Sequence, residues 1–145
     1  MDTEVEILLV EDNAGDAEMT IRELQRHRIG NHIVHLKDGA DAIDFVFGTG
    51  IYENRNRGHK PKMILLDLRM PRVSGIEVLK TLKSDERSRT IPVVVLTASA
   101  EDPDIRTCYE LGVNSYIVKP VGFENFTKAI AELGMYWLLL NNPPQ

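Results

Sequence analysis

Residues 62–71 read KMILLDLRMP, and they place one carboxylate, Asp67, inside an apolar run. A continuous apolar run of this length is typical of a strand in a parallel sheet that is buried on both faces. Aspartate is among the poorest strand formers, and a buried carboxylate has to be paired, coordinated or neutralised. Asp67 is therefore either a cap or a functional group held on purpose at the end of a buried strand.

Four similar apolar runs accompany this one and predict a sheet of five strands. The five runs occupy residues 6–10, 32–36, 63–68, 92–98 and 115–119. Most of them are too continuous for half-exposed strands, because a half-exposed strand alternates apolar and polar residues. The run at 32–36 alternates more than the others, which places it nearer an edge of the sheet.

The segments between the runs have the periodicity of helices, and we predict helices over residues 14–28, 40–47, 75–83, 102–111 and 122–140. Pro103 in the first turn and Gly112 after the last turn bound the fourth helix. The residues expected on core-facing helix surfaces are Ala17, Ile21, Leu24, Ala42, Ile43, Val46, Phe47, Ile76, Leu79, Leu82, Ile105, Cys108, Tyr109, Phe126, Ile130, Leu133 and Trp137. Strand and helix alternate five times, which predicts an α/β fold with right-handed crossovers and helices on both faces of a parallel sheet.

Composition limits the class of protein. The chain has 145 residues, 43% of them hydrophobic and 27% charged, which indicates one globular domain over residues 1–145. The net charge of −5 argues against a nucleic-acid partner. Cys108 is the single cysteine, so no intramolecular disulfide can form. The N-terminal apolar run is too short for a signal peptide or a membrane span, and we expect a soluble cytoplasmic protein with no membrane partner.

Polar residues follow the predicted strands at the point where each strand ends. Glu11 and Asp12 follow the first strand, Asp67 lies near the end of the third, and Thr97 and Lys119 end the fourth and fifth. In an open parallel sheet these ends face the same way, and ligands bind outside the carboxyl ends of the strands. Any one of these acids would pass for a helix cap, but the whole set predicts one shared cleft.

The chemistry of this set points to phosphoryl transfer. Three carboxylates in one cleft repel each other, and a hard divalent cation with oxygen ligands, such as Mg²⁺, removes that conflict. Lys119 adds a positive charge for phosphoryl oxygens, and the hydroxyl of Thr97 adds a hydrogen bond. A carboxylate nucleophile, a metal and a lysine together favour formation of an aspartyl phosphate.

Four motifs in order carry a resemblance to a known family. They are LLVEDN at 8–13, LLDLRMPRVSG at 65–75, VVVLTA at 93–98 and YIVKP at 116–120. With them the chain resembles a bacterial two-component response-regulator receiver domain over essentially its whole length. The resemblance implies a (βα)5 doubly wound, flavodoxin-like sheet with strand order 2-1-3-4-5. It also implies that Asp67 accepts a phosphoryl group from a histidine kinase.

The resemblance further implies roles for individual residues. Asp12, Asp67 and the backbone carbonyl of Arg69 would ligate Mg²⁺, and Glu11 would act through a water. Lys119 and Thr97 would bind the phosphoryl group, Thr97 and Tyr116 would form a coupled switch, and Lys119–Pro120 would be a cis peptide bond. Arg69 and Ser99 each lie two residues past a site residue, so we predict that they tune the lifetime of the phosphate.

A narrower resemblance rests on a loop and a tail. The polar connection 48–62, which contains YEN, and the C-terminal YWLLLNNPPQ resemble stand-alone regulators that partner phytochrome histidine kinases. The final turns of helix 122–140 add apolar residues beyond its core stripe, namely Met135, Tyr136, Leu138, Leu139 and Leu140. Such surplus apolar surface marks interfaces, and we predict a homodimer held by this helix and the face of the fifth strand. A helix end folded over its own domain is the alternative.

Other readings of the same residues are less well supported. A phosphatase of the haloacid-dehalogenase type would need an aspartate where Arg69 stands. A flavin-binding module would need a phosphate loop after the first strand, where the acidic EDNAGD would repel phosphate. A degenerate dimeric scaffold would not need the complete site. A phosphorelay intermediate would have the same site, so this alternative stays open.

The remaining candidate residues have ordinary explanations. The four histidines, His27, His32, His35 and His59, lack clear metal-ligand spacing, and Cys108 fits a small core residue. The basic residues of the loop (Arg55, Arg57, His59 and Lys60) fit a solvated face, with partner docking as the alternative.

Overall fold

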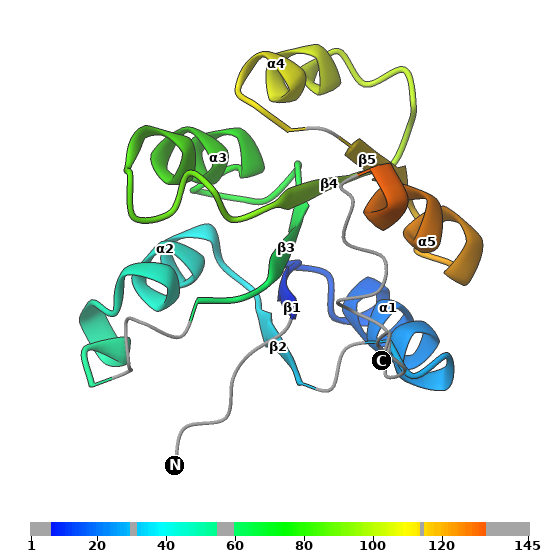
Figure 1. Cartoon of the computed structure of the whole chain (residues 1–145), viewed down its shortest axis with the longest axis horizontal. Coiled ribbons are helices and arrows are strands. Elements are labelled where there is room, and N and C mark those ends of the chain that lie inside the picture. The colour runs from blue at the N-terminus through cyan, green and yellow to red at the C-terminus, as the bar shows by residue number, and fades with distance from the viewer. Residues whose placement is uncertain (1–6, 30–31, 55–59, 114, 133–145) are drawn as a thin grey trace, which may run out of the picture.

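Five strands and five α-helices alternate along the described residues, as the computed structural model in Figure 1 shows. The structure describes residues 7–29, 32–54, 60–113 and 115–132. The strands are β1 Ile7–Val10, β2 Ile33–Leu36, β3 Met63–Asp67, β4 Val93–Thr97 and β5 Ser115–Val118. The helices are α1 Ala14–Arg26, α2 Gly39–Phe47, the short 3-10 helix η1 Gly50–Tyr52, α3 Gly75–Ser84, α4 Asp104–Glu110 and α5 Phe123–Glu132.

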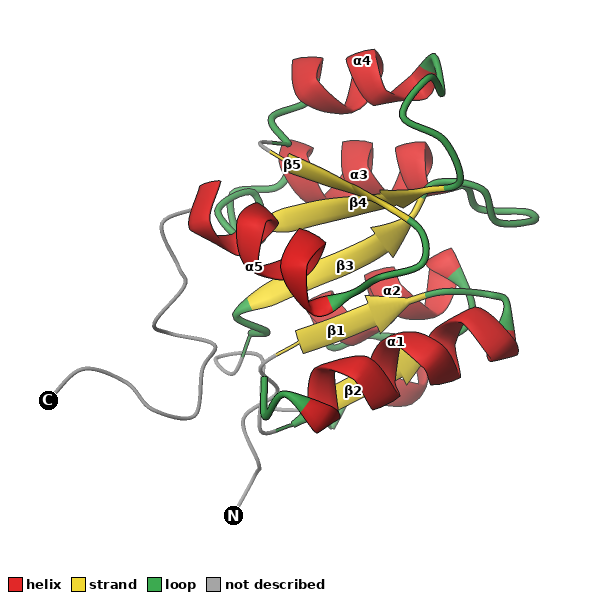
Figure 2. Ribbon diagram, turned by 90° about the vertical axis from the view of Figure 1, so that its right-hand side faces the viewer, coloured by secondary structure: helices red, strands yellow, loops and turns green. Residues whose placement is uncertain are grey.

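The strands form one parallel sheet in the order β2-β1-β3-β4-β5, which confirms the predicted fold. Helices α1 and α5 cover one face, while α2, α3 and α4 lie on the other (Figure 2). The central strands therefore face protein on both sides, which explains their continuous apolar sequences. Because all five strands run the same way, their carboxyl ends meet at one edge of the sheet.

The core is divided by the sheet into two clusters, and alternate residues of each central strand enter different clusters. In β3, Ile64 and Leu66 pack with α2, α3 and α4, while Met63 and Leu65 pack with α1 and α5. Each central strand is thus held from both faces, so the polar residues at its end start from a fixed backbone.

Local sequence accounts for where three helices begin. Asn13, Asp38 and Ser74 are N-caps of α1, α2 and α3, and each side chain accepts a hydrogen bond from a backbone N–H of the first turn. Gly112 has a φ of 105°, which ends the α4 region as the sequence predicts.

The predicted bounds and faces need several corrections. Helix α1 ends at Arg26, and α4 is shorter than predicted because Pro103 is its N-cap. Tyr109 was placed on the core face but is 45% exposed, because it lies at the edge of the sheet against the ring of Tyr116. The periodicity also missed Phe45 and Val78, which are buried. The remainder of the predicted helix 122–140, including Leu133, Trp137 and the surplus apolar residues, lies outside the described residues.

Candidate functional site

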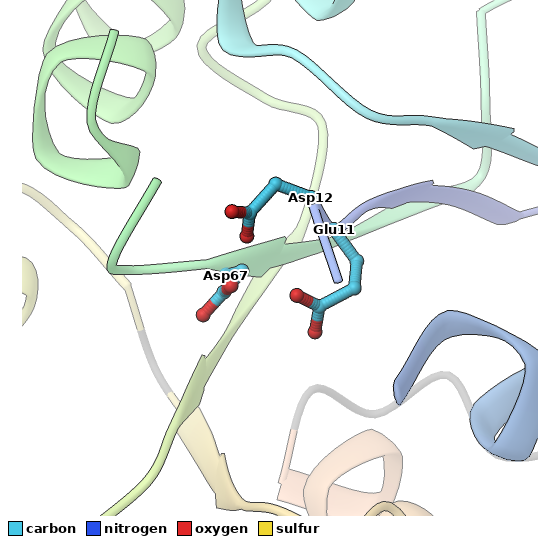
Figure 3. A group of neighbouring side chains, drawn as sticks. All are labelled: Glu11, Asp12 and Asp67. Carbon is cyan, nitrogen blue, oxygen red and sulfur yellow. The ribbon is translucent and has the colours of Figure 1, made fainter. Parts of the chain in front are cut away.

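Three carboxylates meet at the carboxyl edge of the sheet (Figure 3). Glu11 and Asp12 follow β1, and Asp67 is the last residue of β3. One carboxylate oxygen of each lies within 4.8 Å of the others. Glu11 is 1% exposed and Asp67 3%, while Asp12 is exposed. The structure thus brings together the three acids that were predicted from the strand ends, and two of them are buried.

Gly75 explains how the chain returns over the end of β3. A Cβ atom on this residue would lie 2.3 Å from the backbone oxygen of Asp67 and 2.8 Å from the Cα of Leu68. The Gly75 N–H also donates to the carbonyl of Leu68 at 3.0 Å. Only a residue without a side chain fits this approach, which lets α3 begin directly behind the strand that carries Asp67.

Lys119 supplies the positive charge among these acids. Its Nζ lies 3.1 Å from Glu11 Oε1, 3.1 Å from Asp16 Oδ2 and 3.5 Å from Asp67 Oδ1. Burial by itself would lower the pKa of Lys119, but the bonds to Glu11 and Asp16 and the charge of Asp67 raise it. The ammonium is therefore held charged. The peptide bond that follows it, Lys119–Pro120, is cis.

Asp67 is the carboxyl group that the site perturbs most clearly. Burial, a hydrogen bond with Glu11 and the charge of Glu11 raise its pKa from 3.8 to about 7. The charge of Lys119 and the N–H of Arg69, which lies 3.5 Å from Asp67 Oδ1, act in the opposite direction. One lysine thus does not offset the crowded carboxylates. An oxygen-only donor set with surplus negative charge fits a hard divalent cation.

Thr97, Ser99 and Arg69 lie beside the acids and are tied to the loop before α4. The Oγ1 of Thr97 donates to the carbonyl of Ser99 at 3.1 Å and lies 3.3 Å from Asp102 Oδ2. The guanidinium of Arg69 pairs with Asp102 at 2.7 Å and with Asp104 at 2.9 Å. The Arg69 side chain therefore faces α4, while its backbone N–H faces Asp67.

Tyr116 lies in β5, two residues before the end of that strand, and is partly buried. Its ring meets the ring of Tyr109 edge to face, with centroids 6.3 Å apart. The ring thus occupies the outer side of the sheet next to α4. The Tyr116 ring also packs against the core cluster on the α4 side of the sheet.

Sequence reasoning missed two acidic residues of this region. Asp16, in the first turn of α1, holds Lys119, and Asp102 joins Thr97 to Arg69. Their signals were present but weak: Asp16 lies one helical turn past the acidic pair, and Asp102 lies in the acidic stretch that follows Thr97. Among the described histidines, His27 stacks on Phe123, and Nε2 of His35 lies 2.8 Å from the backbone oxygen of Glu11. Cys108 is buried, and burial raises the pKa of its thiol to about 11.

A doubly wound parallel sheet with acids and a lysine at its carboxyl edge defines a receiver module for phosphoryl groups, and comparison with known proteins agrees. The model of the response regulator receiver domain family matches residues 7–131. The chain belongs to this family. Phosphotransfer from a histidine kinase is the family's general role, and its members bind a divalent metal.

The chain is also similar to individual response regulators. The structure of the bacteriophytochrome response regulator AtBRR has a TM-score of 0.87 and 48% identity, and the match covers 97% of this chain and 100% of that one. Response regulator Rcp1 of Synechocystis is 38% identical over 91% of this chain and 88% of its own. The structure of its Mn²⁺-bound form has a TM-score of 0.74, with 97% and 99% of the two chains covered. The Probable methanogenesis regulatory protein FilR2 of Methanothrix harundinacea is 44% identical over 95% of this chain and 86% of its own.

Within the described residues, no helix has both the length and the apolar character that crossing a membrane requires.

Proposed function

We propose that this chain is a cytoplasmic response regulator that accepts a phosphoryl group on Asp67 from a bacteriophytochrome-class histidine kinase. The observation that carries this proposal is the placement of Asp67 beside Glu11, Asp12 and Lys119 at the carboxyl edge of the sheet. The likeness to AtBRR and Rcp1 supports the class of kinase. The net charge of −5 supports a protein partner rather than a nucleic acid.

The chemistry follows from the positions of the side chains. An oxygen of Asp67 attacks the phosphorus of a phosphohistidine, an O–P bond forms, the P–N bond breaks, and the imidazole leaves with the electron pair. Lys119, which already contacts Asp67, moves with the charge to a phosphoryl oxygen. Asp12, Asp67 and the carbonyl of Arg69 would hold Mg²⁺, with Glu11 acting through a water. When bound there, the cation would offset the negative charge of these acids and of the transferring oxygens.

We also propose that Thr97 and Tyr116 read the phosphorylated state. When the hydroxyl of Thr97 turns toward the phosphoryl group it vacates space that the Tyr116 ring, now against Tyr109, can enter. Arg69 and Ser99 border the approach of water and so set the rate of hydrolysis. Amide shifts on beryllofluoride binding should concentrate at residues 97–120, and shifts confined to the neighbours of Asp67 would contradict the switch.

Phosphotransfer from a kinase tests the function directly. A bacteriophytochrome histidine kinase is first labelled with radioactive ATP and freed of nucleotide, and this chain is then added with Mg²⁺. The label should pass to the chain within seconds to minutes and should be lost in alkali, because an acyl phosphate is labile there. Transfer to a matched chemotaxis-type receiver from the same kinase should be much slower. Equal transfer to both would contradict the phytochrome assignment. If the kinase transfers no label but acetyl phosphate still labels this chain, only the assignment to this kinase class fails.

We further propose a homodimer that forms through the C-terminal segment and the β5 face. The support is the surplus of apolar residues at 135–140 and the exposed Tyr109 next to β5. Sedimentation at about 10⁻⁵ M should give a dimer for the full chain and a monomer for a chain that ends at Gly134. A full-length monomer would contradict the dimer. A dimer that survives truncation would move the interface to α4 and β5.

A further inference from the structure

Asp102 occupies a junction between three elements that the proposed function does not yet use. It lies in the loop before α4, and its side chain is 10% exposed. Its Oδ2 lies 3.3 Å from the hydroxyl of Thr97 at the end of β4 and 3.3 Å from Nε of Arg69, just past β3. Its Oδ1 accepts from Nη2 of Arg69 at 2.7 Å and from the backbone N–H of Asp104 at 2.9 Å. One carboxylate thus ties both strand ends to α4.

The hydroxyl of Thr97 is fully engaged in this arrangement. A threonine hydroxyl has one proton to donate. Two acceptors face it, the carbonyl of Ser99 at 3.1 Å and the carboxylate of Asp102 at 3.3 Å, and the Ser99 N–H donates to its oxygen at 3.3 Å. The hydroxyl cannot donate to a phosphoryl oxygen on Asp67 while it donates to either acceptor. Activation therefore requires that these bonds break.

Arg69 holds the carboxylate of Asp102 in place beside the hydroxyl of Thr97. The guanidinium contacts both carboxylate oxygens of Asp102, and its third nitrogen pairs with Asp104 at 2.9 Å. Two-point contacts of this kind fix the plane of a carboxylate. The oxygen that faces Thr97 is thereby kept in place from the opposite side of the cleft.

We propose that Asp102 is a positioning residue that holds the Thr97 hydroxyl away from Asp67, so that an incoming phosphoryl group competes with Asp102 for the hydroxyl proton. This inference rests on the proposed function, because it concerns the response to a phosphoryl group on Asp67. Asp102 sets how strongly the unphosphorylated arrangement is retained, and its removal favours the activated one.

The variant Asp102→Asn separates this role from simple capping of α4. An amide oxygen in place of Oδ1 still accepts from the Asp104 N–H and from Arg69, which preserves the start of α4. The amide nitrogen then takes the place of Oδ2 and offers Thr97 a donor instead of an acceptor. It also gives up the weaker contact with Nε of Arg69, while the shorter bond from Nη2 to the amide oxygen remains. The competing bond is lost while the local fold is kept.

The experiment measures the affinity for beryllofluoride, a phosphoryl mimic, with saturating Mg²⁺, by amide shifts in the full chain. Because hydrogen bonds to a charged acceptor are the stronger kind, Asp102→Asn should bind about five- to tenfold more tightly than the wild type. Glu110→Gln is the matched control, since it removes one negative charge from α4, the helix that follows Asp102, and Glu110 pairs only with Arg106 among the described ion pairs. Its affinity should equal that of the wild type.

A double-mutant cycle with Thr97→Val tells the hydrogen bond from a general charge effect. In the Thr97→Val background, which lacks the hydroxyl, Asp102→Asn should give no further gain. The same gain in both backgrounds would overturn the proposal in favour of charge repulsion alone, and an Asp102→Asn affinity equal to the wild type would overturn it as well. If the wild type itself fails to bind beryllofluoride, the proposed function fails, and this inference fails with it.

Discussion

Replacing Asp67 with asparagine is expected to abolish phosphoryl labelling of the chain while the fold remains intact. The wild type, incubated with acetyl phosphate and Mg²⁺, should gain one phosphoryl group, and Asp67→Asn should gain none. The amide preserves the shape of the side chain and lacks the nucleophilic oxygen. Intact-mass measurement detects the added group, and circular dichroism verifies the fold. Chelation of Mg²⁺ should also stop labelling of the wild type, since the crowded acids and the incoming phosphoryl oxygens are all negative.

Asp85→Asn is the control that shows whether labelling depends on the chemistry of the site or only on how exposed a carboxylate is. Asp85 lies in the loop after α3, where bonds from Arg87 lower its pKa to about 2. It is therefore ionised and much more accessible than Asp67, but it lacks the acids and the lysine of the site. Its replacement should leave labelling unchanged. If Asp67→Asn is labelled as well as the wild type, Asp67 is not the acceptor, and the proposed function loses its central residue.

The fold was accessible from sequence because burial on both faces leaves a strong pattern. The runs at β1, β3 and β4 lack alternation, and the structure places each of them between two layers of helices. The strand ends were therefore predicted to within one residue, and the strand-end rule then grouped Glu11, Asp67 and Lys119 correctly. Backbone position alone decides these neighbours.

Contacts that depend on side-chain direction were not accessible in this way. Asp16 reaches Lys119 from α1, and Asp102 reaches Arg69 across the cleft, 33 residues apart in sequence. No periodicity reports such pairs. The prediction that Tyr109 faces the core was wrong for a related reason. Helical spacing aligns Tyr109 with Ile105 and Cys108, but α4 lies at the edge of the sheet, where one side of the helix is left uncovered.

The metal-free protein is expected to lose stability as pH rises from about 4 to about 7, and Asp67 is the cause. Burial and the neighbouring Glu11 raise its pKa from 3.8 to about 7 in the folded state. Across this range the folded protein retains a proton that the unfolded chain has released. The contribution of Asp67 to stability is therefore complete below pH 4 and is lost as pH rises through about 7.

The size of the effect follows from the same shift. The difference between 3.8 and about 7 corresponds to at most about 4 kcal/mol of unfolding free energy. Asp67→Asn stays neutral at every pH, so it should be no more stable than the wild type near pH 4 and about 2 to 4 kcal/mol more stable at pH 8. Urea unfolding in the presence of a chelator at several pH values measures this difference. Asp85→Asn should show no such gain between pH 5 and 8, because its carboxylate is already ionised there.

Mg²⁺ should narrow the difference in stability between the wild type and Asp67→Asn at pH 8. A divalent cation binds the ionised carboxylates of the folded wild type, and at a concentration of about 100 times the dissociation constant it adds about 2.7 kcal/mol to its stability. Asp67→Asn has lost one of the three clustered carboxylates and should gain less. A wild type that is as stable as the variant at pH 8 without metal would show that Lys119 already offsets the charge of the ionised Asp67.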